Sequence, residues 1–254
     1  METHESPELK ALLNMGLAGL AAGAKDMDHL DGAAAAFNYI RIADLVDSYY
    51  KAGTLQMPVL DWGCGYGQVS WLLQRRGLSV VSCDVERRPA RDSIESLNQV
   101  NVTYLQDPLR LPYDSGSFGG VLSVGVLEHV GAENVESSLA EISRVLRPGG
   151  FVFIFMLPNR FSWVEFIADL RGSSVHPDKY TFGRIEQLLK DHSFVMERKW
   201  RRNVLPRNLT GLSPRIKSAY GHYYRQIESV DHALSILWPF AAFSGVIELV
   251  ARKI

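Results

Sequence analysis

A glycine-rich loop near residue 60 carries the strongest chemical signal in the chain. An apolar run leads into Asp61, and Gly63, Gly65 and Gly67 follow at alternate positions. Glycines at this spacing let a backbone turn sharply off a strand and present its N–H groups at the start of a helix, which makes an anion site. The loop therefore predicts a ligand-binding turn at the end of a buried strand.

The same loop argues against a dinucleotide ligand. A dinucleotide fingerprint would place its third glycine at position 68, where Gln68 stands, and would avoid a carboxylate at Asp61 beside a pyrophosphate. A carboxylate next to exposed N–H groups favours an amino-acid head group, which has both an ammonium and a carboxylate. S-adenosylmethionine has such a head group, and a nicotinamide-dependent oxidoreductase is disfavoured.

Further acidic residues follow two later strand-like segments, Asp84 after one and Asp107 after the next. With Leu127-Glu128-His129-Val130 and Leu146-Arg147-Pro148-Gly149-Gly150, this ordered set resembles the class I S-adenosylmethionine-dependent methyltransferases over about residues 55–157, and it looks closest to the quinone-biosynthesis-like, methyltransferase-11-type subgroup. The resemblance implies an enzyme with S-adenosyl-L-methionine as cofactor and S-adenosyl-L-homocysteine as product. It also implies that Asp84 bonds the ribose hydroxyls and Asp107 the adenine amino group. The predicted cofactor-binding residues are Asp61, Gly63, Cys64, Gly65, Gly67, Asp84, Val85, Asp107, Pro108 and Leu109.

Methyl transfer from a sulfonium mainly requires aligned reactants and the exclusion of water, but an oxygen or carbon acceptor also needs a base. His129 is the leading catalytic candidate, because it follows the fourth predicted strand at the sheet edge that carries Asp61. His176 and Tyr180, in the loop after the fifth strand, are further catalytic candidates. Two alternatives stay open: His129 as a helix-capping residue, and His176 as a surface residue.

Departures from the family pattern bear on two predictions, whether a metal is bound and which class of acceptor is methylated. Gly119 stands where an aspartate is common, and Gly125 stands where some quinone-type relatives have a metal-binding acid, so no metal is expected. No Asn/Asp-Pro-Pro-aromatic motif follows the fourth strand, which disfavours amino groups of nucleobases. We expect O- or C-methylation of a small-molecule or lipid-linked acceptor. The alternative is a non-catalytic sensor or partner subunit that binds S-adenosylmethionine.

Strands and helices must alternate to position these residues. Such alternation predicts a Rossmann-like α/β fold with parallel strands, helices on both faces and ligands at the carboxyl ends of the strands. The family resemblance adds a seven-stranded, mostly parallel sheet with an antiparallel last strand. The predicted strands are 58–62, 79–84, 102–106, 119–124, 150–157, 194–203 and 246–251, and the predicted helices are 9–22, 33–51, 68–76, 89–99, 133–145, 161–170 and 181–192.

A chain of 254 residues suffices for one large α/β domain with appendages. We expect residues 1–54 to form helices over the cofactor site, 55–157 the cofactor-binding core, and 158–254 the acceptor-side helices, an insertion and the closing strands. The start of the chain lacks the basic and apolar regions of a signal peptide, and Cys64 and Cys83 have no metal-ligand spacing. A cytoplasmic location with two packed, reduced thiols is therefore expected.

Charge is segregated along the chain. The net charge is −1, yet between Arg184 and Arg225 ten Lys and Arg residues face three Asp and Glu residues, a net of +7. Because the net charge of the whole chain is close to zero, no nucleic-acid partner is expected. The basic segment is either a solvated face or a surface for an anionic acceptor or a membrane. Contact of Ile236, Leu237, Trp238 and Phe240 with a membrane interface stays open beside ordinary packing, and the oligomeric state also stays open.

Overall fold

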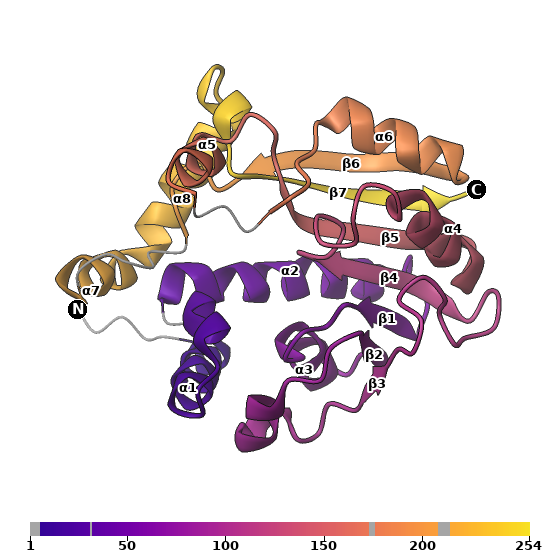
Figure 1. Cartoon of the computed structure of the whole chain (residues 1–254), viewed down its shortest axis with the longest axis horizontal. Coiled ribbons are helices and arrows are strands. Elements are labelled where there is room, and N and C mark those ends of the chain that lie inside the picture. Colours follow the sequence, from indigo (N-terminus) through magenta and orange to yellow (C-terminus); the bar gives the residue numbers. More distant parts are fainter. Residues whose placement is uncertain (1–5, 31, 173–175, 208–213) are drawn as a thin grey trace.

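The computed structural model describes residues 6–30, 32–172, 176–207 and 214–254, which form a sheet enclosed by helices (Figure 1). The seven strands lie in the order β3-β2-β1-β4-β5-β7-β6. β7 runs antiparallel to both of its neighbours and the other pairings are parallel, so the predicted fold class is confirmed. The strands are β1 (Val59–Trp62), β2 (Val80–Asp84), β3 (Val102–Tyr104), β4 (Phe118–Val124), β5 (Leu146–Pro158), β6 (Phe194–Arg202) and β7 (Val246–Lys253).

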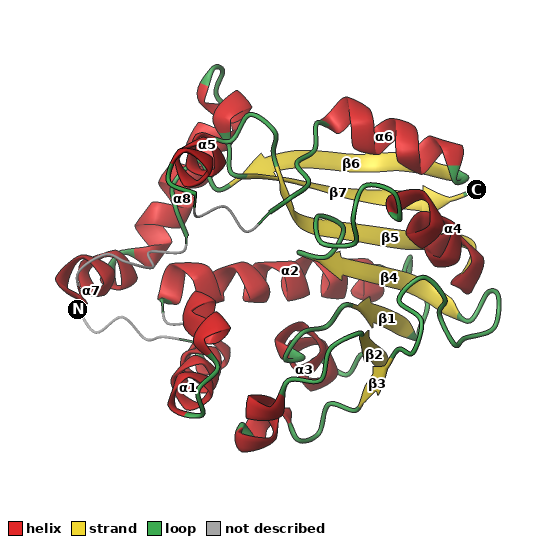
Figure 2. Ribbon diagram, in the orientation of Figure 1, coloured by secondary structure: helices red, strands yellow, loops and turns green. Residues whose placement is uncertain are grey.

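Helices pack on both faces of the sheet (Figure 2). Phe151, Phe153 and Phe155 of β5 face the core shared with α1, α2 and α3, whereas Val152 and Ile154 face the core shared with α4 and α6. Because side chains alternate across a strand, one apolar strand serves both cores. The helices are α1 (Pro7–Ala21), α2 (Ala33–Lys51), α3 (Gln68–Arg75), α4 (Val135–Val145), α5 (Trp163–Leu170), α6 (Phe182–Asp191), α7 (Pro214–His222) and α8 (Tyr224–Ile236), with short 3₁₀ segments η1 (Lys25–Leu30), η2 (Pro89–Ser93), η3 (Glu95–Leu97) and η4 (Phe240–Phe243).

The helix predicted at 89–99 is wrong. Two 3₁₀ turns, η2 and η3, replace it and are separated by Ile94, whose backbone is extended with φ −105° and ψ 93°. Asp92, Ser93 and Ser96 fall in this segment, and short polar side chains compete with helix formation by bonding nearby backbone groups. The connection between β2 and β3 is therefore irregular.

Close packing explains the glycine that departs from the family pattern at the start of β4. A Cβ atom at Gly119 would overlap the carbonyl oxygen of Gln56, and the Gly119 N–H donates to the Pro58 carbonyl at 3.0 Å. A side chain at this position would have to displace the segment that leads into β1. Among the described residues, no helix has both the length and the apolar character needed to cross a membrane.

Candidate functional site

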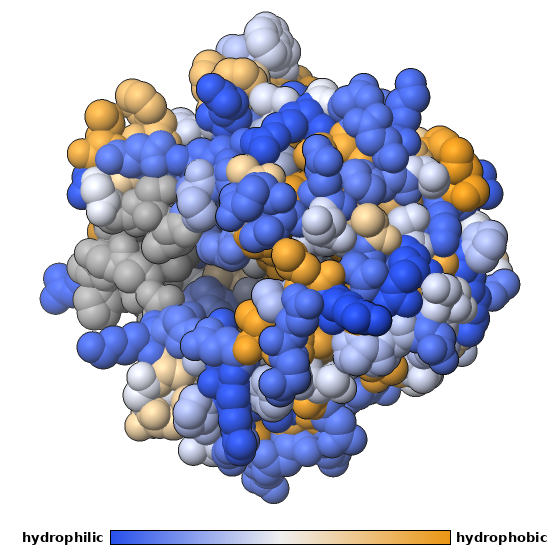
Figure 3. Space-filling view, turned by 45° about the vertical axis from the view of Figure 1, so that its right-hand side comes forward, coloured by the Kyte–Doolittle hydropathy of each residue, from blue (hydrophilic) through white to orange (hydrophobic). Residues whose placement is uncertain are grey.

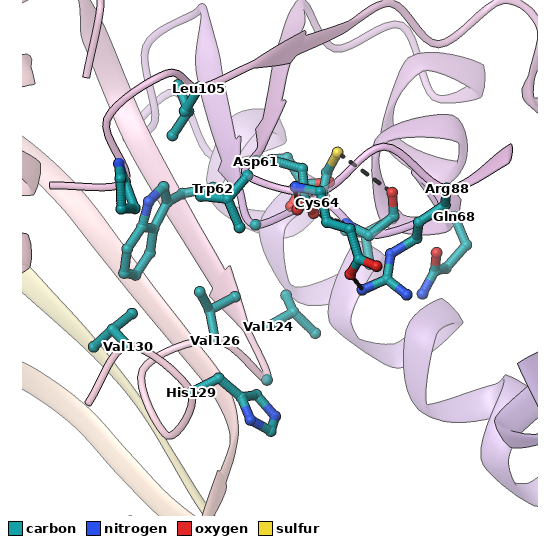
Figure 4. Close-up of a pocket in the computed structure, with 18 of the residues that line it drawn as sticks. Asp61, Trp62, Cys64, Gln68, Arg88, Leu105, Val124, Val126, His129 and Val130 are labelled. Atoms are coloured by element: carbon teal, nitrogen blue, oxygen red, sulfur yellow. Dashed lines mark hydrogen bonds and ion pairs between the residues drawn. The ribbon is translucent and has the colours of Figure 1, made fainter. Parts of the chain in front are cut away.

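A cavity of about 610 Å³ opens at the carboxyl ends of β1, β2 and β4. This volume is in the range of small-molecule sites, and the position is where α/β sheets bind their ligands. Figure 4 shows Asp61, Cys64 and Gln68 on one side of the cavity and His129 and Val130 on the other. The predicted site residues that line it are Asp61, Gly63, Cys64, Gly65, Asp84, Val85, Pro108, Leu109 and His129.

The glycine loop follows β1, and three of its residues, Gly63, Gly65 and Gly67, have left-handed backbone conformations. Gly63 and Gly65 have φ values of 69° and 57°, a region that side chains rarely adopt. A Cβ atom at Gly63 would lie 2.7 Å from the Val126 side chain, whereas one at Gly65 would meet nothing within 4 Å. Gly63 thus allows a close approach of two loops, and Gly65 leaves open space in the cavity.

Asp84, at the end of β2, fixes the conformation of that loop. One carboxylate oxygen accepts a hydrogen bond from the Gly65 N–H at 2.7 Å, and the other accepts from the Glu86 N–H at 2.9 Å. Each oxygen has a further lone pair, so the carboxylate is still able to accept hydrogen bonds from a ligand in the cavity.

Asp61, in β1, is only 2% exposed. Burial raises the pKa of Asp61 to about 6. Hydrogen bonds from Ser70 lower this pKa, and the negative charge of Asp84 raises it further. The Ser70 hydroxyl donates to the Asp61 carboxylate at 2.5 Å. Gln68 also lines the cavity, and its side-chain oxygen is buried without a hydrogen-bond partner. A buried carboxyl and an unsatisfied amide oxygen in one cavity wall suit a cationic group such as an ammonium.

Two predicted cofactor residues lie outside the lining of this cavity. Gly67 is the N-cap of α3 with φ 94°, and its role is to turn the chain into the helix. Asp107 is exposed and its carboxylate accepts from the Leu109 N–H at 2.9 Å, which closes a local turn. Both cysteines, Cys64 and Cys83, are buried free thiols, and burial raises the pKa of Cys83 to about 12.

Several lining residues were not identified from the sequence. Tyr39 comes from α2, more than twenty positions before the glycine loop, and no local pattern marks it. Arg88 lines the cavity and pairs with Asp26 of η1. Trp62 and Leu105 could have been found, because each lies within the last two residues of a predicted strand. The remaining lining residues that were missed are Gln68, Val69, Glu86, Val124, Gly125, Val126, Val130 and Asn134.

His129 lies in the turn after β4, where its N–H donates to the Val126 carbonyl at 2.9 Å. Burial, and then the charge of His176, lower the pKa of His129 below its ordinary value. The two histidine rings lie side by side, with centroids 5.6 Å apart. His129 is therefore a neutral imidazole near pH 7, the form that accepts a proton.

His176 is held by a carboxylate from α5. Its Nδ1 atom lies 2.9 Å from Oε1 of Glu165. Burial lowers the pKa of His176, but the hydrogen bond and charge of Glu165 outweigh burial, and the net pKa is raised. The fold thus places a histidine of raised pKa beside one of lowered pKa.

Tyr180 lies beneath the site and does not line the cavity. It is fully buried, and its hydroxyl donates to the Leu127 carbonyl at 3.3 Å. Arg184 covers its ring at 4.8 Å. In this position Tyr180 supports the turn that carries Glu128 and His129, and it is screened from an acceptor in the cavity.

Three of the described residues could hold a metal ion. The ligand atoms of Glu128, His129 and His176 all lie within 4.8 Å of one another. Glu128 is 2% exposed, one of its oxygens has no hydrogen-bond partner, and burial raises its pKa to about 7. No metal was expected from the sequence because Gly125 stands in place of a metal-binding acid, but the fold brings the distant His176 close to Glu128.

Comparison with known proteins connects this geometry to a family. Residues 60–154 match a family model described as a methyltransferase domain. An uncharacterized chloroplastic methyltransferase of Arabidopsis thaliana is 35% identical, over 50% of this chain and 39% of that protein. The cyclopropane-fatty-acyl-phospholipid synthase of Escherichia coli is 33% identical, over 41% of this chain and 27% of the synthase. The chain thus spans less than half the length of these relatives.

The fold also matches solved structures. The crystal structure of a SAM-dependent methyltransferase from Archaeoglobus fulgidus superposes with a TM-score of 0.55 at 17% identity, covering 85% of this chain and 94% of that one. At this identity the likeness concerns the fold, which is the Rossmann-like sheet described above.

Proposed function

Residues 60–154 belong to the class I S-adenosylmethionine-dependent methyltransferases, and from this premise we propose that the protein transfers a methyl group to an oxygen or carbon atom of a small-molecule or lipid-linked acceptor. The observation that carries the proposal is one cavity lined by Asp61, Asp84 and His129. The two acids belong to the side that would hold the cofactor, and the neutral histidine belongs to the side that would face the acceptor.

The residues present fit the cofactor. The buried carboxyl of Asp61 and the unpaired oxygen of Gln68 would meet the ammonium group, and Asp84 would accept from the ribose hydroxyls. Val85, Leu105 and Leu109 would cover the adenine ring with apolar surface. When bound, S-adenosylmethionine supplies the methyl group from its sulfonium.

The side chains around the acceptor would align it, exclude water and move one proton. The apolar side chains of Trp62, Val126 and Val130 would align the acceptor and exclude water from it. The neutral His129 would take the proton that the acceptor loses as its oxygen or carbon atom is methylated. His176 lies within hydrogen-bond distance of Glu165, which raises the pKa of this histidine, and in its protonated form His176 would stabilise negative charge that develops on the acceptor.

The name of one relative supports a lipid-linked acceptor. The Escherichia coli synthase is named for a fatty-acyl phospholipid, and it is 33% identical to this chain over 105 residues. The basic segment after residue 184 supports an acceptor that carries phosphate or carboxylate.

Calorimetric titration tests the cofactor. S-adenosylhomocysteine is expected to bind and NADH is not. Asp61→Asn should weaken S-adenosylhomocysteine binding at least about tenfold, because it removes a charge-assisted contact to the ammonium. Asp114→Asn, an exposed acid outside the cavity, is the matched control and should bind normally. Binding of NADH alone would overturn the proposal, and unchanged affinity in Asp61→Asn would remove Asp61 from the site.

Incubation with labelled cofactor and an extract of the source organism tests the transfer. A labelled small molecule or lipid is the expected product, and its identification would give the acceptor. Binding of S-adenosylhomocysteine without transfer to any component of the extract would favour the non-catalytic sensor or partner subunit.

A further inference from the structure

An apolar surface lies at the carboxyl edge of the sheet, outside the cofactor cavity. Helix α5 has no buried residue in its length, and Phe161 precedes it as an exposed aromatic side chain. Leu170 is 73% exposed, and Trp163 and Phe166 are also exposed. A helix of this composition normally buries its apolar stripe against a core. Here the apolar side chains are exposed to solvent instead.

A second segment contributes to the same surface. Ile236 is 71% exposed and Trp238 is 82% exposed. Leu237, Phe240 and Phe243 are also exposed. They lie between the end of α8 and the start of β7, in the yellow segment at the top of Figure 1. In the space-filling view the visible face is mostly hydrophilic, and hydrophobic side chains gather at its upper edge (Figure 3).

Buried hydrogen bonds hold the two segments side by side. Asn159 is buried at the end of β5, and its side-chain amide donates to the carbonyls of Ala242 and Ser244, each at 2.9 Å. Its side-chain oxygen accepts from the Phe161 N–H at 3.3 Å. The Trp163 indole donates to the Val204 carbonyl at 2.7 Å. The apolar side chains are thus presented on a fixed scaffold.

A basic groove borders this apolar surface. A second cavity, of about 820 Å³, is lined by Ile236 and Ala241 of the apolar side and by one acid, Asp44. Its basic lining residues are Arg41, Arg198, Lys199, Arg201, Arg202 and His232.

Two guanidinium groups of the groove have no carboxylate partner among the described residues. Arg41 pairs with Glu248, and Arg202 pairs with Glu228. Arg198 instead stacks on the Trp200 ring and Arg201 on the Phe182 ring at 4.8 Å, and Nε of Arg201 is buried without a hydrogen-bond partner. A guanidinium held by its face keeps its N–H edge available for an anion such as a phosphate.

We propose that the apolar surface and the basic groove together dock the protein on an anionic lipid bilayer. Aromatic and aliphatic side chains that protrude beside arginines form the pattern of an interfacial membrane contact, in which apolar groups enter the acyl boundary and cations meet acidic headgroups. Docking itself does not depend on the proposed methyl transfer.

Helix α5 links the docking surface to the cavity. Phe166 points outward from this helix, while the neighbouring Glu165 holds His176 beside His129. A bilayer against α5 would therefore lie next to the acceptor side of the site, where a lipid-linked acceptor would have a short path to His129.

Vesicle flotation tests the proposal. The wild-type protein is expected to bind vesicles of phosphatidylcholine mixed with phosphatidylglycerol, and to bind pure phosphatidylcholine more weakly. The double substitution Trp238→Ser and Phe240→Ser should weaken binding at least about tenfold, because it removes two exposed rings from the interface. Leu17→Ser, at an exposed apolar residue on α1, is the matched control and should bind like the wild type.

Charge is tested in the same assay. Arg198→Gln and Arg201→Gln should each weaken binding to the anionic vesicles about fivefold and leave binding to neutral vesicles unchanged. Lys10→Gln, an exposed cation on α1, is the control. Each variant should bind S-adenosylhomocysteine like the wild type, which verifies its fold and separates docking from cofactor binding.

Two results would overturn the proposal. One is wild-type protein that stays unbound on anionic vesicles, or that binds them equally with and without Trp238 and Phe240. The other is a concentration-dependent dimer, seen by analytical ultracentrifugation, that these substitutions abolish while vesicles are not bound. That outcome would assign the apolar surface to a second copy of the chain.

Discussion

Burial governs the acid–base chemistry of the residues around the cavity. It raises the pKa of Asp61 to about 6 and that of Glu128 to about 7, and it lowers the pKa of His129. All three shifts have the same cause, because a low-dielectric environment disfavours whichever form is charged. The site is thereby prepared for a cationic ligand on the Asp61 side and for proton acceptance on the His129 side.

Glu128→Gln should stabilise the protein in a pH-dependent way. The pKa of Glu128 is raised from 4.5 to about 7, so the folded state holds this proton more tightly than the unfolded state. The protonated Glu128 carboxyl therefore makes its full contribution to the free energy of unfolding below pH 4.5. This contribution, on the order of 3 kcal/mol, is lost as pH rises through 7. The variant should melt above the wild type at pH 8 and close to it at about pH 4.

The exposed Glu133→Gln serves as the control, with little change at either pH. Thermal melts over this pH range provide the measurement. A difference between Glu128→Gln and the wild type that is the same at all pH values would contradict the raised pKa.

His129→Ala should slow turnover and spare cofactor binding. Loss of a general base costs about 100-fold or more in kcat, whereas the Kd of S-adenosylhomocysteine should change by less than about twofold. Wild-type turnover should fall at low pH, as pH drops below the lowered pKa of His129 and this base becomes protonated. It should also fall at high pH, as pH rises above the raised pKa of His176 and this group loses its proton. His192→Ala, at the end of α6, is the control. Unchanged turnover in His129→Ala would show that His129 is not the base and would favour the alternative that it is a helix-capping residue.

At the scale of elements, the irregular connection between β2 and β3 supports the glycine loop. Arg91 of η2 donates from Nε to the Tyr66 carbonyl at 3.1 Å, and from Nη2 to the carbonyls of Leu97 and Val100. Tyr66 lies between Gly65 and Gly67, so this guanidinium joins the ligand loop to η3.

Arg91→Gln should therefore destabilise the fold and weaken cofactor binding. Leaving partly buried carbonyls unpaired costs about 1–3 kcal/mol, to be measured by urea unfolding. Affinity for S-adenosylhomocysteine should fall as the loop loses its support. Arg87→Gln, in the same segment but exposed and paired with Asp92 at 3.4 Å, should leave both quantities nearly unchanged. Equal effects of the two substitutions would show that Arg91 has no special role.

At the scale of the whole molecule, the proposed functional residues lie at one edge of the sheet. Parallel strands bring their carboxyl ends together, which places Asp61, Asp84 and the turn with His129 around one cavity. The segment that follows β5 and the segment that precedes β7 meet at the same edge. They do so because Pro158, the last residue of β5, pairs there with Val246, the first residue of β7. The cavity and the apolar surface are thus neighbours, and α5 belongs to the apolar surface while its Glu165 contacts His176 beside the cavity.

The sequence by itself determined the alternating fold, the glycine turn and the acids at the ends of β1 and β2. These features depend on periodicity and on short spacing, which local chemistry enforces. Only the tertiary structure decided that Gly67 and Asp107 stand outside the lining of the cavity and that Tyr180 lies beneath it. It also decided that Glu165 contacts His176 and that the His176 ring lies beside the His129 ring. Such contacts link distant parts of the chain through packing, and no spacing rule specifies them.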